Sequence, residues 1–158
     1  MIRSGVGQPV AALVLGAWLG AAVFFAAIVA PATFRTVPDS AAAGALVRAT
    51  LPAIFDAGAV AGLLVLWLGF GRRAAVICGA GITACCAVSQ FVVARRIDQL
   101  RLHLATPIET LAPSDPSRLA FDHLHMASVG LLAAAMILAV LAIVWLTRSG
   151  LASAVSPE

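Results

Sequence analysis

One acidic residue, Asp56, stands alone in a long apolar stretch and is the side chain best suited to carry chemistry. It is the only charged residue between Arg48 and Arg72. A carboxylate at the centre of a membrane helix costs about 2.5–3.5 kcal/mol to insert, so it normally faces other helices and has a polar partner. Two interpretations stay open: a site for a proton, cation or substrate, or an Asp–Arg pair that fixes helix packing.

A second group of polar residues lies near the start of the last apolar stretch. Phe121, His125 and Ser128 follow i, i+4, i+7 spacing and therefore share one stripe of a helix. Arg118 and Asp122 form an i, i+4 pair on a neighbouring stripe. A histidine hydrogen-bonded to a charged neighbour is the simplest outcome here.

A metal site would draw on the same region. His125 and Met126 are its candidate ligands, because soft ligands select Cu(I). His123 points to another side of the helix, and Cys85 and Cys86 lie more than a turn deeper in the membrane. We therefore predict no metal and no cofactor, and we keep a copper- or haem-associated redox accessory as an alternative.

Charged residues also gather at the end of the third apolar stretch, where Arg95, Asp98 and Arg101 follow each other at i, i+3, i+6. Such helix ends usually contact water or lipid head groups, yet alternating span directions bring this end to the same membrane face as Asp56. The sequence therefore predicts a polar intramembrane cluster that forms a binding or proton site or a structural ion-pair network. Its members are Arg35, Asp56, Arg95, Asp98, Arg118, Phe121, His125 and Ser128.

The elements that must position these residues are membrane helices. Of 158 residues, 62% are hydrophobic and 11% charged, against about 25% charged in an ordinary soluble domain, and the mean hydropathy is +1.04. This excludes a soluble globular protein, a disordered chain and an ordinary nucleic-acid-binding domain. Four stretches of 21–23 residues (about 9–30, 49–71, 74–94 and 125–147) are each long enough to cross a bilayer core of about 30 Å.

These lengths predict one all-α domain, an antiparallel up-down four-helix transmembrane bundle with helix extensions on one face. Asp39 with Ser40, and Asp115 with Pro116, are expected to begin helices. The segment 31–38 is expected to break the first helix, and Pro52 to kink or restart the second. Two GxxxG pairs, Gly16 with Gly20 and Gly58 with Gly62, predict close helix packing.

Arginine placement predicts the orientation. The ten basic residues are all arginine, and this composition favours a bacterium with GC-rich DNA and its cytoplasmic (inner) membrane. Arg3, Arg72, Arg73 and Arg148 mark one face, whereas six arginines mark the other. Raw number favours the second face as cytoplasmic. However, several of those six lie at ion-pair spacing and the N-terminal segment usually dominates insertion, so we predict that both termini are cytoplasmic.

Short apolar motifs resemble a known family. The similarity lies in residues 15–20 (LGAWLG), the Phe24–Phe25 pair, residues 29–34 (VAPATF) and the stretch 121–128. In these residues the chain resembles the uncharacterised four-helix membrane family that includes eukaryotic transmembrane protein 205. That resemblance implies a four-helix membrane protein without established catalytic residues. A fainter similarity links the chain to the copper-resistance D membrane proteins, whose metal-ligand-rich segments are missing here.

The sequence contains no GxSxG, HExxH, Walker A or dinucleotide-binding motif, and we expect no enzyme. The leading hypothesis is a non-enzymatic integral membrane protein: an accessory subunit or self-associating module that packs against other helices in the lipid bilayer, as a homo-oligomer or in a larger membrane complex, without nucleic acid. The alternative is a small transporter or an ion- or proton-conducting protein that uses Asp56 and the His125 region.

Overall fold

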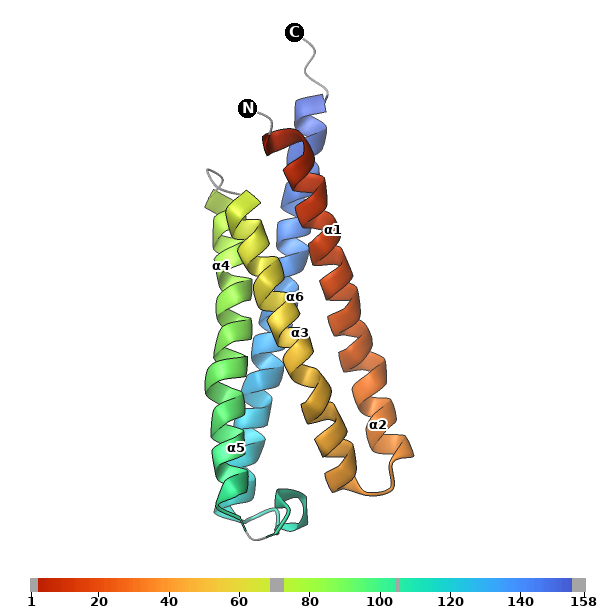
Figure 1. The fold of residues 1–158 in the computed structure, drawn as a ribbon, viewed down its shortest axis with the longest axis vertical. Coiled ribbons are helices and arrows are strands. Elements are labelled where there is room, and N and C mark those ends of the chain that lie inside the picture. The colour runs from red at the N-terminus through yellow and green to blue at the C-terminus, as the bar shows by residue number, and fades with distance from the viewer. Residues whose placement is uncertain (1–2, 69–72, 105, 155–158) are drawn as a thin grey trace.

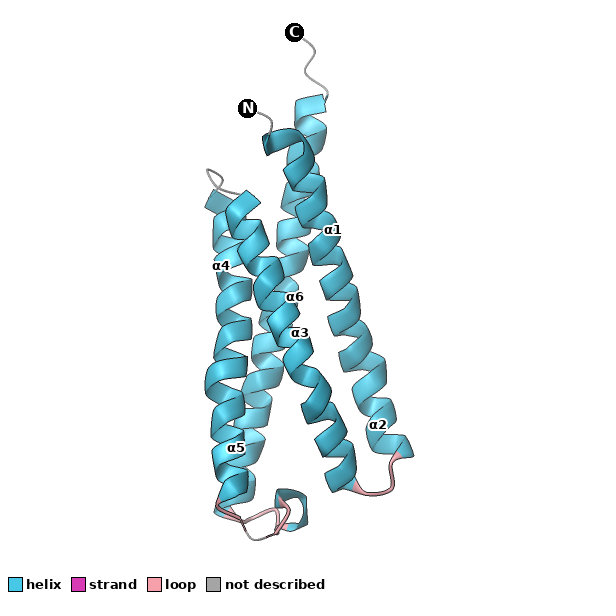
Figure 2. Ribbon diagram, in the orientation of Figure 1, coloured by secondary structure: helices cyan, strands magenta, loops and turns pink. Residues whose placement is uncertain are grey.

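Four long helical segments, connected at alternating ends, make up residues 3–68, 73–104 and 106–154, which this computed structural model describes (Figure 1). No strand occurs among these residues (Figure 2). The elements are α1 (Arg3–Phe24), η1 (Phe25–Val29), α2 (Ala30–Thr36), α3 (Ser40–Leu68), α4 (Arg73–Val88), η2 (Ser89–Val93), α5 (Ala94–Leu102), η3 (Ile108–Thr110) and α6 (Pro116–Ala154). The predicted all-α, four-helix transmembrane architecture is confirmed.

Four segments are long and apolar enough to cross a membrane: Gly7–Thr36, Ser40–Leu68, Arg73–Leu102 and Pro116–Arg148. The outer surface of the bundle is also apolar, and Leu13, Ile77 and Val60 are 75%, 67% and 65% exposed. Contiguous exposed apolar surface on this scale requires an apolar surrounding phase. The protein is therefore a multi-pass membrane protein whose outer side chains face the lipid bilayer.

The helix starts follow the local sequence. Asp39 Oδ1 accepts a hydrogen bond of 2.9 Å from the backbone N–H of Ala41, and Asp115 Oδ1 accepts one of 2.8 Å from Ser117. Each carboxylate satisfies a backbone donor that the first helical turn leaves without a partner. Pro116 is the first residue of α6, where its missing N–H carries no penalty. Both predicted helix starts are confirmed.

The expected break after the first span is wrong. The helix runs through Pro31 and ends only at Thr36, by way of the five-residue π-helix η1 and then α2. A proline in a helix lacks its N–H and its ring crowds the carbonyl four residues earlier. The wider π turn directly before Pro31 relieves that crowding and lets the helix continue. α3 likewise runs through Pro52 without restarting.

Close helix contacts define the narrow core of the bundle. α1 and α4 each pack against α3 and α6. Trp18 of α1 is 5% exposed and its indole N–H donates a hydrogen bond of 2.9 Å to the carbonyl of Ile54 in α3. The neighbouring core side chains are mostly small, which allows the helices to approach each other closely. The buried alanines are Ala11, Ala22, Ala43, Ala61, Ala75, Ala135, Ala139 and Ala142.

The two GxxxG pairs differ in burial and in helix contacts. Gly58 and Gly62 are buried in α3, and a Cβ on Gly62 would lie 2.8 Å from the carbonyl oxygen of Gly79 in α4. This pair makes the predicted close contact. Gly16 and Gly20 are exposed on α1, with no atom within 4 Å of an added Cβ. Within the bundle this pair makes no close contact, because the neighbouring positions Leu15 and Trp18 turn inward instead, and close packing against a helix outside the bundle stays a prediction.

Candidate functional site

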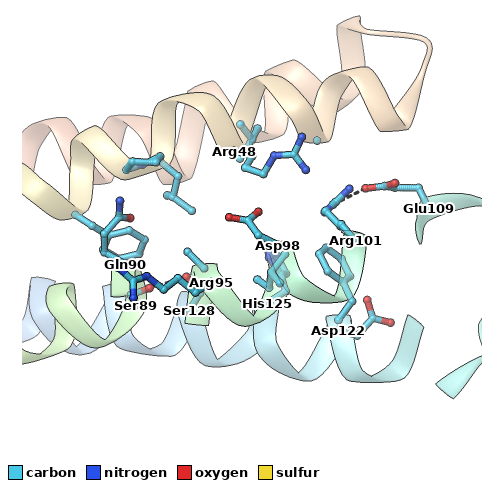
Figure 3. Close-up of a pocket in the computed structure, with 18 of the residues that line it drawn as sticks. Arg48, Ser89, Gln90, Arg95, Asp98, Arg101, Glu109, Asp122, His125 and Ser128 are labelled. Atoms are coloured by element: carbon cyan, nitrogen blue, oxygen red, sulfur yellow. Dashed lines mark hydrogen bonds and ion pairs between the residues drawn. The ribbon is translucent and has the colours of Figure 1, made fainter. Parts of the chain in front are cut away.

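A cavity of about 850 Å³ occupies the bundle end that carries the loop between α5 and α6. Here the first half of α3 diverges from α5 and from the start of α6 (Figure 1). Figure 3 shows the polar side chains that project into the resulting space. The lining residues come from α2, α3, η2, α5, η3 and α6: Phe34, Ser40, Gly44, Val47, Arg48, Leu51, Pro52, Phe55, Ser89, Gln90, Phe91, Ala94, Arg95, Ile97, Asp98, Arg101, Glu109, Arg118, Phe121, Asp122, His125 and Ser128.

The inner end of the cavity is closed by a hydroxyl pair. Ser89 and Ser128 are 1% and 8% exposed, and their Oγ atoms lie 2.8 Å apart. Ser89 is the first residue of the π-helix η2, which also supplies Gln90 and Phe91 to the lining. Single π turns inside α-helices rotate the following residues and occur often at functional sites. This hydrogen bond ties η2 to α6 within the membrane.

The middle of the cavity carries charges without ionic partners. Arg48 on α3 and Asp98 on α5 project from opposite walls (Figure 3). Arg95, one turn deeper than Asp98, has its guanidinium carbon 5.9 Å from the centre of the Phe91 ring. In the described part of the chain none of these three charged groups forms a salt bridge. The site therefore keeps two cations and one anion available for a bound molecule.

A half-buried ion pair lies at the outer end of the cavity. Arg101 Nη2 donates a hydrogen bond of 2.8 Å to Glu109 Oε1, and the two side chains are 23% and 13% exposed. The Arg101 guanidinium also lies over the Phe121 ring at 5.2 Å. Because Glu109 lies within the short helix η3 of the α5–α6 connection, this pair anchors the loop against the cavity.

Glu109 stays ionised in this setting. Burial acts to raise the pKa of its carboxyl group, but the hydrogen bond from Arg101 and the charges of Arg101 and Arg118 outweigh it and leave the pKa below its ordinary value. Its second oxygen, Oε2, is buried without a hydrogen-bond partner, as is Arg101 Nε. The pair therefore retains hydrogen-bonding capacity.

The start of α6 forms one wall of the cavity. As their i, i+4, i+7 spacing predicted, Phe121, His125 and Ser128 lie on the same face of the helix, and all three line the cavity. Phe121 and His125 stack with ring centres 6.0 Å apart and an interplanar angle of 14°. Arg118 Nε lies 3.4 Å from Asp122 Oδ1, and Arg118 Nη1 donates a hydrogen bond of 3.3 Å to the carbonyl of Ile108. The i, i+4 pairing of Arg118 with Asp122 is confirmed.

The predicted polar cluster is brought together in part. Six of its eight members line the cavity: Arg95, Asp98, Arg118, Phe121, His125 and Ser128. Arg35 is outside the cavity, where it is exposed and donates a hydrogen bond of 3.2 Å to the carbonyl of Pro31 one turn earlier.

The placement of Asp56 in that cluster is wrong. Asp56 is exposed on the outer surface of α3 and forms no ion pair or side-chain hydrogen bond with any described residue. Phe55, Gly58 and Gly62 turn inward, and each residue advances about 100° around a helix. Asp56 therefore points away from the core. Asp56 and His125 do not share a pathway, so the transport alternative in that form is not supported.

The two candidate metal ligands, His125 and Met126, do not face the same space. His125 lines the cavity, whereas Met126 is 64% exposed and outside the lining. Within residues 3–68, 73–104 and 106–154, no group of three or more His, Cys, Asp or Glu side chains is arranged to hold a metal ion. The geometry does not favour the copper or haem alternative.

The sequence analysis did not identify four of the polar lining residues as candidates: Arg48, Ser89, Gln90 and Glu109. Arg101 was noted beside Arg95 and Asp98 but was not included in the predicted cluster. Arg48 shares a helix stripe with Leu51, Pro52 and Phe55, and that spacing was available in the sequence. The adjacent polar pair Ser89–Gln90 inside an apolar span was a further signal. For Glu109, which reaches the cavity only because the loop folds back, the sequence held no signal.

Fold and cavity define a small multi-pass membrane protein with a charged, partly apolar cavity at one end of its bundle. The chain belongs to the family described as "Domain of unknown function (DUF4149)", which matches residues 13–106. This range contains most of α1, all of α3 and the α4–η2–α5 segment. Comparisons with curated proteins and with solved structures find no match. They give no support to a similarity to transmembrane protein 205 or to the copper-resistance D proteins.

Proposed function

We propose that the protein is a non-enzymatic accessory subunit that packs its outer surface against other membrane helices, from a second copy or a larger membrane complex. The observation that supports this proposal is the exposed position of Asp56 within a membrane span. Asp56 lies seven residues inside Ala49, which is about 10 Å along α3. The aspartate side chain is too short to reach the membrane surface from that depth.

A carboxylate exposed to lipid at this depth carries the insertion penalty of about 2.5–3.5 kcal/mol without compensation. A neighbouring helix that donates a hydrogen bond or brings a cation would remove it. Asp56 lies among apolar side chains on the outer stripe of α3, including Val60, Leu63 and Trp67. Such a stripe with one central polar group is suited to a specific helix–helix contact.

The exposed glycines of α1 support the same function. Gly16 and Gly20 leave open space around their Cα atoms, and small residues at i, i+4 let another backbone approach closely. Because Gly16 and Gly20 make no close contact inside the bundle, a helix from outside the bundle can pack against them.

The test compares the Asp56→Leu variant with wild type by crosslinking in native membranes and by particle mass in mild detergent. Because Asp56 has no partner among the described residues, the variant should fold as stably as wild type. It should lose the associated species. Asp98→Asn, which removes another carboxylate without an ion pair, is the control and should keep them. A wild-type protein that is monomeric in the membrane, or an Asp56→Leu variant that still associates, would refute the proposal.

We also propose the orientation and location: a bacterial cytoplasmic membrane with both termini in the cytoplasm. α1 begins and α6 ends at one end of the bundle (Figure 1). Arg73 and Arg148 lie near that end and, with the N-terminal Arg3, support its cytoplasmic placement. Reporter fusions at the C-terminus should give cytoplasmic signals, and fusions in the 107–116 loop should give periplasmic ones. The reverse pattern would assign control of insertion to the six-arginine face.

A further inference from the structure

The packing of outer helix faces against other helices does not explain why the bundle contains a charged cavity at one end. The cavity volume of about 850 Å³ falls within the range of about 300–1,000 Å³ that small-molecule sites occupy. Asp56 is exposed and does not line the cavity, so a ligand there does not use the residue on which the proposed association rests. We propose that this cavity binds an anionic amphipathic molecule, with its acidic head group on Arg48 and Arg95 and its alkyl chain along α3.

The balance of charges indicates an acidic head group. The lining contains four arginines and three acidic residues. Two arginines are already paired, Arg101 with Glu109 and Arg118 with Asp122. The remaining charges are Arg48, Arg95 and Asp98, which leaves an excess of one positive charge. Guanidinium groups bind carboxylates and phosphates through two parallel hydrogen bonds, and these two arginines have no carboxylate partner within the described chain.

The wall beside Arg48 indicates an alkyl chain. Leu51 and Phe55 follow Arg48 at i+3 and i+7, so all three side chains share one stripe of α3 and line the cavity. Because α3 runs from the loop end into the membrane, the apolar residues lie deeper than the arginine. Ile97 and Phe91 add apolar surface on the opposite side. A molecule with its charge near Arg48 and its chain directed inward matches this gradient.

Asp98 discriminates between head groups. It projects into the cavity opposite Arg48 (Figure 3), and it repels an anion that binds to the two arginines. An anionic ligand should therefore bind more tightly when this charge is removed. A zwitterionic head group would instead use Asp98 for its cationic part, and its removal would weaken binding. The sign of the change identifies the ligand class.

The experiment measures equilibrium binding to the full-length protein in phosphatidylcholine nanodiscs, with empty nanodiscs as the blank. The probes are radiolabelled octyl phosphate, octyltrimethylammonium and inorganic phosphate. Octyl phosphate should bind saturably and much more tightly than the other two, because only it offers both charge and chain. Equal binding of the cationic amphipath, or no saturable binding of octyl phosphate, would overturn the inference.

Two matched pairs of variants locate the site. Arg95→Gln should weaken octyl phosphate binding about tenfold, in line with the loss of one charged hydrogen bond. Arg96→Gln removes the same charge from the next residue, which does not line this cavity, and should leave binding unchanged. Ala94→Phe fills the cavity without changing a charge and should abolish binding, whereas Val92→Phe adds the same ring at an exposed position and should not.

Asp98→Asn should bind octyl phosphate more tightly than wild type. Weaker binding by this variant, or equal losses in Arg95→Gln and Arg96→Gln, would contradict an acidic head group at this site. Association through Asp56 is measured separately, so these results leave that proposal unaffected.

Discussion

Adding a single methyl group at Gly62 should push α3 and α4 apart. A Cβ there would lie 2.8 Å from the carbonyl oxygen of Gly79 and 2.9 Å from the backbone nitrogen of Thr83. Both are backbone atoms and cannot turn aside as the end of a flexible side chain can. The Gly62→Ala variant therefore forces a shift of the helices, and overpacking of this kind costs about 1–3 kcal/mol.

A matched substitution removes the effect of helix propensity. Alanine is favoured over glycine in a helix by about 0.8–1.0 kcal/mol, and this gain accompanies Gly62→Ala and Gly16→Ala alike. At Gly16 the new methyl group meets no atom within 4 Å. The difference between the two variants in free energy of unfolding should therefore equal the packing penalty alone, about 1–3 kcal/mol.

Unfolding by SDS from dodecylmaltoside micelles, followed by tryptophan fluorescence, gives the two free energies. Gly79→Ala provides a second check, because its Cβ would lie 2.8 Å from the carbonyl oxygen of Gly62. One separation of the helices relieves both clashes, so the double variant Gly62→Ala/Gly79→Ala should lose less stability than the sum of the single variants. Equal stabilities for Gly62→Ala and Gly16→Ala would refute the close contact of α3 with α4.

Three further predictions concern hydrogen bonds. Ser89→Ala should destabilise the bundle by about 1–2 kcal/mol because it leaves the buried hydroxyl of Ser128 without its partner. The double variant Ser89→Ala/Ser128→Ala should lose less stability than the two single variants together, and SDS titration of the two single variants and the double variant measures this coupling. Glu109→Gln should expose the α5–α6 loop to limited proteolysis at neutral pH. The lowered pKa of Glu109 means that its contribution is complete above its ordinary value of 4.5 and is lost as the pH falls through the lowered one, so the difference from wild type should vanish in acid. Trp18→Phe should lower the free energy of unfolding by about 1 kcal/mol through loss of the indole hydrogen bond to α3, and an unchanged SDS midpoint would contradict that bond.

The lengths and ends of the helices could be predicted from local sequence. The four spans follow from stretches of apolar residues that match the bilayer, and Asp39 and Asp115 mark the starts of α3 and α6. The alternation of spans also assigns Arg95, Asp98 and His125 to one end of the bundle. These features depend on distance along the chain, which the sequence states directly.

The direction in which each side chain points was decided only by the tertiary structure. A soluble helix shows its inner face by its apolar stripe, but these helices are apolar on every side, because lipid and core both accept apolar residues. The sequence therefore could not show that Gly58 and Gly62 face inward while Gly16 and Gly20 face outward.

The same reason explains Asp56 and the cavity. An inward Asp56 was the lower-energy expectation for an isolated bundle, yet the packing of Phe55, Gly58 and Gly62 against neighbouring helices fixes the rotation of α3 and turns Asp56 outward. Glu109 reaches the cavity through a loop whose path depends on its contact with Arg101. Sequence thus determined how far each residue lies along its helix, and tertiary packing determined which way it faces, because helix rotation is set by contacts between segments distant in the chain.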